Sequence, residues 1–271
     1  ASPGTHWGAR ASWYYWINFP LWMASLAVVC PELLEVIFGG RIDPVWSLVI
    51  QLAFIWIVTW IAAYPVCDSI LILNLSAAIK ILLALTVGVL GIVYVSKNGF
   101  VNSMEARTFL PSFDLNSLSY ISVILFNFLG FEVVCTFAKD MENPARDIPK
   151  AIIMGGLAIG AIYLFCGFGI GAAIPADQID PDFGMIVAVM TMVGEASPIF
   201  IVIAIVFLIT LFANMASWSF GVNAVAEYAA KNQNMPKVFA HENPKTGMPT
   251  GAAVVNGIVA SAVLLIQLIP D

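Results

Sequence analysis

Long runs of apolar residues constrain this chain more than any other feature. A helix that crosses about 30 Å of hydrocarbon needs around 20 apolar residues. With 61% hydrophobic and only 10% charged residues, the sequence has more apolar side chain than a soluble domain can bury. We therefore predict an all-α integral membrane protein with about seven transmembrane helices. The predicted spans are 13–38, 46–64, 70–95, 118–139, 151–174, 198–228 and 251–269.

The distribution of Lys and Arg predicts the orientation of these spans. Cytoplasmic loops carry an excess of Lys and Arg, and of the 11 such residues seven fall on one side of the spans and three on the other. The richer side is therefore predicted to be cytoplasmic, with the amino terminus inside. Residues 175–197 then form an extracellular loop, in which the apolar stretch 183–193 is too short to cross and predicts an interfacial helix. We treat residues 1–271 as a single transmembrane domain.

Charge and composition exclude several classes of function. Nucleic-acid binding needs a clustered basic face, whereas the formal net charge here is −6, so we expect no nucleic-acid partner. The two histidines, His6 and His241, lie outside the apolar runs, and no HExxH, GxGD or GxSxG string is present. We therefore expect neither an enzyme nor a metal site. The four cysteines lie inside apolar runs without paired spacing, which indicates buried thiols, and no cofactor is expected.

Polar residues inside the predicted spans are the candidates for chemistry. Lys80 lies near the middle of span 70–95, where an ammonium group is costly unless it is paired, neutral or hydrated. Two interpretations stay open: Lys80 fixes packing by snorkelling or an ion pair, or it occupies a cation site and titrates during transport. In span 198–228, Asn214, Ser217 and Asn223 form a polar stripe. This stripe predicts either interhelical hydrogen bonds or the lining of an ion path.

Span 118–139 has the most informative centre, the string FNFLGFE at residues 126–132. A glycine loosens a helix, and a broken helix frees backbone groups that water, substrate or side chains must satisfy. Broken helices near the bilayer midplane bind substrates in many secondary transporters. The alternative is that Gly130 only permits close packing and Glu132 pairs with a basic residue. In span 151–174, Gly156, Gly160, Gly167 and Gly171 predict a helix-packing face.

Three segments carry a resemblance to a known family. FNFLGFE followed by KDMENPARDIPKAI at residues 139–152 looks like the sixth helix and following loop of the amino acid-polyamine-organocation superfamily of transporters. Residues 223–249 resemble the loop between that family's eighth and ninth helices. Residues 77–85 are similar to its fifth helix, where some members carry a lysine thought to substitute for a bound sodium. The seven spans then correspond to the third to ninth helices.

The resemblance implies a LeuT-like fold of two inverted repeats, incomplete in this chain, and secondary active transport of amino acids by alternating access. The transport would be proton-coupled symport or amino acid exchange, in the plasma or bacterial inner membrane. The implied partners are an amino acid substrate, protons and the lipid bilayer. The implied substrate-binding residues are Phe126, Asn127, Leu129, Gly130, Phe131 and Glu132, and the implied ion- or proton-coupling residues are Lys80, Glu132 and Ser217.

Two other classes of protein compete with this interpretation. A seven-helix receptor or retinal protein would fit the number of spans and an intramembrane lysine, but it gives no role to the Gly-Phe-Glu break. A truncated structural or regulatory membrane subunit would fit a chain that ends as this one does. The residues at both ends lead us to expect the central part of a longer permease, without the family's first and second helices.

Overall fold

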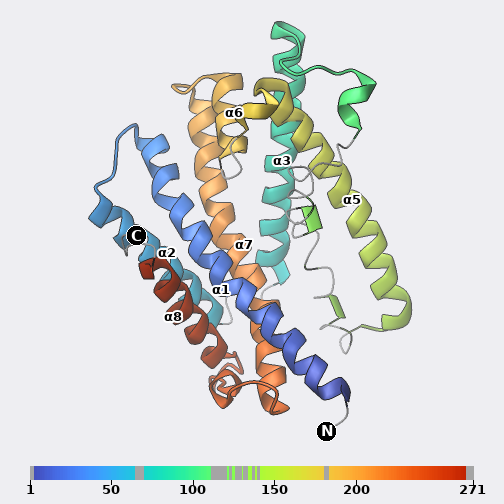
Figure 1. The fold of residues 1–271 in the computed structure, drawn as a ribbon, viewed down its shortest axis with the longest axis vertical. Coiled ribbons are helices and arrows are strands. Elements are labelled where there is room, and N and C mark those ends of the chain that lie inside the picture. The colour runs from blue at the N-terminus through green and yellow to red at the C-terminus, as the bar shows by residue number, and fades with distance from the viewer. Residues whose placement is uncertain are drawn as a thin grey trace. The chain divides into compact units, whose positions relative to one another are not determined.

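The computed structural model describes residues 3–64, 70–110, 121, 124–125, 130, 134–135, 138, 141–179 and 183–266. In this part of the chain the regular structure is helical, and no strand occurs (Figure 1). Five of the described helices are long and apolar enough to cross a membrane. The α-helices are α1 (Pro3–Phe38), α2 (Pro44–Ala63), α3 (Ile70–Asn98), α5 (Pro144–Ala173), α6 (Gly184–Val193), α7 (Pro198–Lys231) and α8 (Thr250–Ile266). Short 3-10 helices cover Ala106–Phe109, Ala176–Gln178 and Lys237–Ala240.

Six of the seven predicted spans coincide with helices, and the seventh, 118–139, lies almost wholly outside the described residues. Two spans were predicted to begin too late: the first at residue 13, whereas α1 begins at Pro3, and the fifth at residue 151, whereas α5 begins at Pro144. Pro144 suits a first helical turn because its fixed φ fits there and its missing N–H is not needed. Asp147 adds a carboxylate to the first turn, where the helix dipole favours negative charge.

The chain divides into two compact units, which we describe separately. Unit 1 comprises residues 1–79 and 204–271, and unit 2 comprises residues 80–203. In unit 1, α1, α2 and α8 lie side by side and each contacts the other two (Figure 1). Large side chains such as Phe19, Leu33 and Phe54 are fully buried there. The ring of Phe54 lies 4.5 Å from that of Phe212 in α7, so aromatic packing extends through this core.

In unit 2, α3 and α5 approach each other closely through glycines. A Cβ atom added to Gly169 would lie 2.3 Å from the carbonyl oxygen of Val87, and one added to Gly91 would lie 2.5 Å from the Cα of Gly169. Only residues without a side chain allow two backbones to come this close. The residues that make this contact are Val87, Gly88, Gly91 and Gly169.

The predicted glycine face of α5 is therefore misplaced with respect to this contact. A Cβ added to Gly160, Gly167 or Gly171 would meet nothing within 4 Å. The helix uses Gly169, which the regular glycine spacing did not single out, because its position faces the backbone of α3.

Helix α6 occupies the stretch predicted to be a short helix. It is followed by Gly194, whose φ of +88° favours glycine.

Candidate functional site

Most of the predicted substrate-binding segment lies outside the described residues. This holds for Phe126, Asn127, Leu129, Phe131 and Glu132. Gly130 is described, and it lies in a turn with φ of +107°. A positive φ of this size does not occur in an α-helix, and glycine adopts it more readily than any residue with a side chain. The backbone therefore leaves helical geometry at the glycine where the sequence predicts a break.

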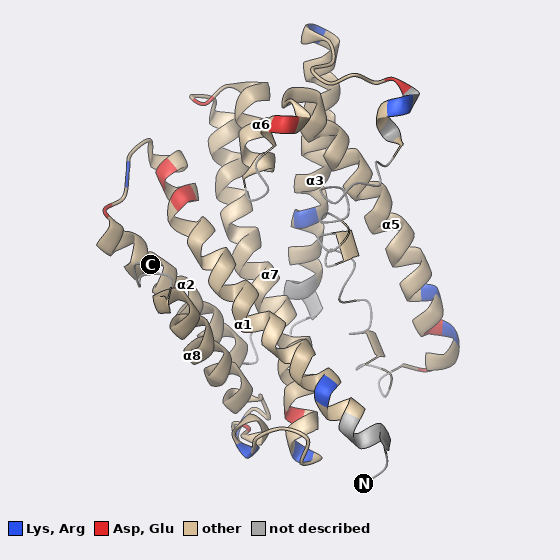
Figure 2. Ribbon diagram, in the orientation of Figure 1, with Lys and Arg blue, Asp and Glu red and all other residues tan. Residues whose placement is uncertain are grey.

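Lys80 lies in the middle third of α3 and is half-buried. Figure 2 shows that charged residues in the described part of the chain gather toward helix ends and loops, with few in the long middle stretches. The next residues of α3 are Ile81, Leu82 and Leu83, so the ammonium group is carried by an apolar segment. Such a position is costly for a charge in a membrane and is typical of a functional residue.

Ser217 lies on the part of α7 that belongs to unit 1, whereas Lys80 and Gly130 belong to unit 2. Its hydroxyl donates a hydrogen bond to the carbonyl oxygen of Ala213, 2.8 Å away, one turn earlier in the helix. The hydroxyl hydrogen is therefore used by the backbone, whereas a hydroxyl oxygen that donates can still accept a hydrogen bond or contact a cation.

A chain of buried polar side chains in unit 1 was only partly predicted. The indole Nε1 of Trp16 donates to Oδ1 of Asn256 at 2.6 Å, and Nδ2 of Asn256 donates to Oδ1 of Asn223 at 2.7 Å. Both asparagines are 1% exposed. Three helices, α1, α8 and α7, are thus joined through side chains, which agrees with interhelical hydrogen bonding for Asn223. The signal for Asn256 was an amide in the apolar span 251–269.

The loop after α7 inserts an aromatic ring beside this chain. Phe239, in the 3-10 helix Lys237–Ala240, meets Trp16 edge-on at 4.9 Å and Trp13 edge-on at 6.3 Å. The two tryptophans stack on each other at 4.9 Å. Because Phe239 is 2% exposed, the loop is anchored in the core of unit 1.

The same loop also carries an ionic cluster. The ammonium group of Lys231, at the end of α7, contacts Glu227 at 2.5 Å and also pairs with Glu242. Hydrogen bonds with the Glu227 side chain and with the Lys231 ammonium lower the pKa of the Glu242 carboxyl below its ordinary value. The cluster ties the loop to the last turn of α7.

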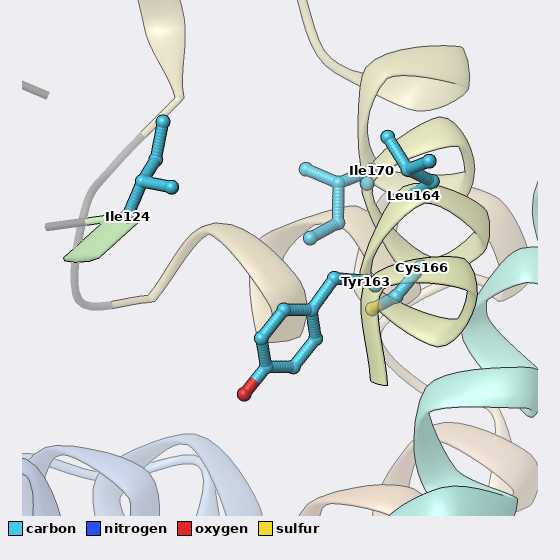
Figure 3. Close-up of a pocket in the computed structure, with 7 residues that line it drawn as sticks. Ile124, Tyr163, Leu164, Cys166 and Ile170 are labelled. Atoms are coloured by element: carbon cyan, nitrogen blue, oxygen red, sulfur yellow. The ribbon is translucent and has the colours of Figure 1, made fainter. Parts of the chain in front are cut away.

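Unit 2 contains an apolar pocket of about 570 Å³ beside α5 (Figure 3). The Tyr163 ring extends from α5 toward the space that Ile124 faces from the other side. The described lining carries no charged side chain and offers polar contacts mainly through the Tyr163 hydroxyl and the Cys166 thiol, so it suits an apolar group. The described lining residues are Ile124, Gly160, Tyr163, Leu164, Cys166, Gly167 and Ile170.

Among the residues that the structure describes, no three His, Cys, Asp or Glu side chains gather as metal ligands would.

Comparison with known proteins finds one family across almost the whole chain. The family described as amino acid permease matches residues 4–270. A relative from Lactococcus lactis subsp. lactis (strain IL1403), named "Probable agmatine/putrescine antiporter AguD", is 52% identical over 267 residues. The alignment covers 98% of this chain and 57% of that protein.

More distant relatives carry related names. The "Putrescine transporter PotE" of Haemophilus influenzae (strain ATCC 51907 / DSM 11121 / KW20 / Rd) is 29% identical over 57% of this chain and 36% of that protein. The "Cationic amino acid transporter 2, vacuolar" of Arabidopsis thaliana is 25% identical over 76% of this chain and 32% of that protein. The chain spans little more than half the length of the first curated relatives it matches.

Proposed function

Because this chain belongs to the amino acid permease family, within the amino acid-polyamine-organocation superfamily, we propose that it forms part of a secondary transporter that exchanges small cationic amines across the membrane. As a member of that family with apolar helices long enough to span a bilayer, it is a multi-pass membrane protein and not an enzyme. The observation that carries the proposal is the 52% identity, over 98% of this chain, to a protein named as an agmatine/putrescine antiporter.

The proposed substrate class narrows the amino acid predicted from the sequence. Agmatine and putrescine carry a positive charge at each end and no carboxylate, and two further relatives are named for putrescine and for cationic amino acids. A site for such molecules needs an anionic partner in a place with little water. Glu132, beside Gly130 in the predicted break, is the carboxylate that we assign to this role.

The remaining predicted residues take supporting roles in this proposal. Phe126, Asn127, Leu129, Gly130 and Phe131 surround the substrate, and the φ of +107° at Gly130 supports a break that frees backbone carbonyls for an ammonium group. Lys80 and Ser217 serve ion or proton coupling. The protein works in the plasma or bacterial inner membrane.

Uptake into proteoliposomes that contain the full-length protein and are loaded with unlabelled putrescine tests the substrate class. Radiolabelled agmatine, putrescine, arginine and alanine are supplied at equal concentrations, and each unlabelled compound competes in turn. We expect saturable uptake of agmatine and putrescine that arginine inhibits weakly and alanine does not. Equal uptake of alanine would contradict a cation site, and uptake of no compound by folded protein would contradict transport.

Two variants test the residue roles in the same assay. Glu132→Gln removes the proposed counter-charge and should raise the KM for putrescine at least about tenfold, the effect of 1.4 kcal/mol of lost binding. Glu142→Gln, on an exposed residue before α5, is the control and should leave the KM unchanged. Lys80→Ala should abolish uptake or flatten its pH profile, whereas Lys97→Ala, on an exposed residue at the end of the same helix, should do neither.

A further inference from the structure

The loop that follows α3 folds back toward the end of α5 in unit 2. Gly99 ends α3 with φ of +79°, and its N–H donates to the carbonyl oxygen of Val95 at 2.9 Å. This left-handed residue reverses the chain direction, as glycine commonly does after a helix. Phe100 then meets Phe168 of α5 edge-on, with ring centres 6.2 Å apart. The loop is therefore held against the last turns of α5 before it continues.

Asn102 in this loop uses both ends of its side-chain amide on the end of α5. Its Nδ2 donates to the carbonyl oxygen of Gly171 at 2.6 Å and to that of Ile174 at 2.7 Å. Its Oδ1 accepts from the backbone N–H of Ala176 at 2.9 Å. The last carbonyls of a helix lack partners within the helix, and here an amide from a residue about 70 positions earlier supplies them.

Helix α6 packs onto the same place. Ala173 and Ile174 at the end of α5 are buried together with Ala188 of α6. Tyr94 of α3 and Met192 of α6 pack against this cluster. The end of α3, the end of α5 and the helix α6 therefore meet around the three backbone groups that Asn102 binds. We call this set, residues 94–102, 170–178 and 184–193, the outer block.

We propose that Asn102 is a positioning residue whose side-chain amide holds the loop after α3 against the end of α5, so that these two parts of the outer block move together during transport. The role during transport rests on the proposed function, whereas the role in holding the two parts together does not. Apolar contacts alone would allow the loop after α3 to slide along the end of α5, because they have no preferred direction. The three hydrogen bonds from Asn102 fix the direction, since two donors and one acceptor must meet two carbonyls and one N–H together.

Hydrogen exchange of the full-length protein in detergent tests whether Asn102 holds the loop after α3 against the end of α5, and it needs no transport. Asn102→Asp keeps the size of the side chain and the acceptor for Ala176 but replaces the donor by an oxygen that faces two carbonyls. We expect amide exchange to become about tenfold faster in peptides covering residues 171–179. Asn98→Ala is the matched control, because Asn98 bonds only the carbonyl of Tyr94 in its own helix and is exposed. Unchanged exchange in Asn102→Asp would overturn the proposal, as would an equal acceleration in the control.

Uptake by Asn102 variants tests whether this contact matters for transport. We expect Asn102→Asp and Asn102→Ala to lower the maximal rate per folded protein several-fold and to leave the KM within about twofold, because Asn102 lies outside the proposed substrate site. Asn98→Ala should match the unaltered protein. A maximal rate that is unchanged while amide exchange is faster would overturn the coupling to transport. An absence of uptake in the unaltered protein would overturn the proposed function and leave the exchange result as the test of the outer block.

Discussion

In unit 1 a chain of side-chain hydrogen bonds joins α1, α8 and α7, whereas in unit 2 the contact between α3 and α5 joins their backbones. The core of unit 1 contains a hydrogen-bonded chain from Trp16 through Asn256 to Asn223, with the ring of Phe239 set beside it. In unit 2, Gly169 meets Val87 so closely that a single Cβ atom would overlap a carbonyl oxygen. Polar side-chain contacts there gather at the helix ends, around Asn102.

This difference indicates what each unit tolerates. A contact through side chains fixes one arrangement, because buried polar groups must keep their partners. A contact through glycines sets how closely two helices approach but does not fix their position along each other. An added side chain would push the two backbones apart. We therefore expect the hydrogen-bonded chain in unit 1 to be sensitive to the loss of particular groups and the contact between α3 and α5 in unit 2 to the gain of even one carbon atom. Gly251 in unit 1 should share the second sensitivity, because a Cβ added there would lie 1.9 Å from the carbonyl oxygen of Val238.

The largest effect is expected for Phe239→Ala in unit 1. The change removes a buried ring and its edge contacts with Trp13 and Trp16, and it should lower the free energy of unfolding by about 4 kcal/mol. Thermal unfolding of the purified protein measures it. Val238→Ala alters the neighbouring residue, which is 51% exposed, and should have little effect. If both variants unfold alike, the loop is not anchored by its aromatic ring.

Gly169→Ala in unit 2 should cost about 3 kcal/mol, because the new Cβ forces α3 and α5 apart. Gly167→Ala lies on the same helix but meets nothing within 4 Å, and it should be neutral or slightly stabilising, since alanine favours helix more than glycine does. The two variants are compared by thermal unfolding in the same detergent. Equal stability would remove the backbone contact from this comparison.

Asn256→Leu should cost about 2 kcal/mol, because Trp16 and Asn223 both lose a buried partner. Ser261→Ala on the same helix removes only a hydrogen bond to the carbonyl of Gly257 and serves as the control. The double variant Trp16→Phe with Asn256→Leu sharpens the result. If the bond between the two residues matters, the double variant loses less stability than the two single variants added together.

The smallest effect concerns the ionic cluster that ties the loop to α7. Because the pKa of Glu242 is lowered in the folded protein, the charged carboxylate stabilises the fold above its ordinary pKa, and this contribution is lost as the pH falls through the lowered value. Glu242→Gln should therefore unfold at a slightly lower temperature than the unaltered protein at pH 7, and this difference should shrink as the pH falls below the ordinary pKa of a glutamate. A difference that persists at low pH would show that the carboxylate charge is not the cause.

The fold could be predicted further than the contacts inside it. Apolar runs located the helices because the bilayer demands length and little else. Residues 144–150 were missed because they are polar, although Pro144 and Asp147 suit a first turn. The glycine spacing on α5 misled because a regular repeat marks a face but does not say which helix meets it, and Gly169 meets the backbone of α3.

The candidate site was predicted from single residues whose chemistry is costly in a membrane. Lys80 stood out as a charge inside an apolar run. Gly130 stood out as a break in a helix, and its φ of +107° agrees with that prediction. Asn256 and Asn102 did not stand out, because a lone amide gives no sign of its partner, and the partners of Asn102 are backbone groups about 70 residues away. Long-range pairing of this kind appears only in the structure.

Counterflow is the measurement that tests the proposed exchange most directly. Proteoliposomes containing the full-length protein are loaded with unlabelled putrescine or left empty, and uptake of labelled agmatine is followed without a pH gradient. We predict that loading raises the initial rate at least about tenfold, because an exchanger returns only with substrate bound. Equal rates in loaded and empty vesicles, with uptake driven by an imposed pH gradient instead, would contradict exchange and indicate proton-coupled symport.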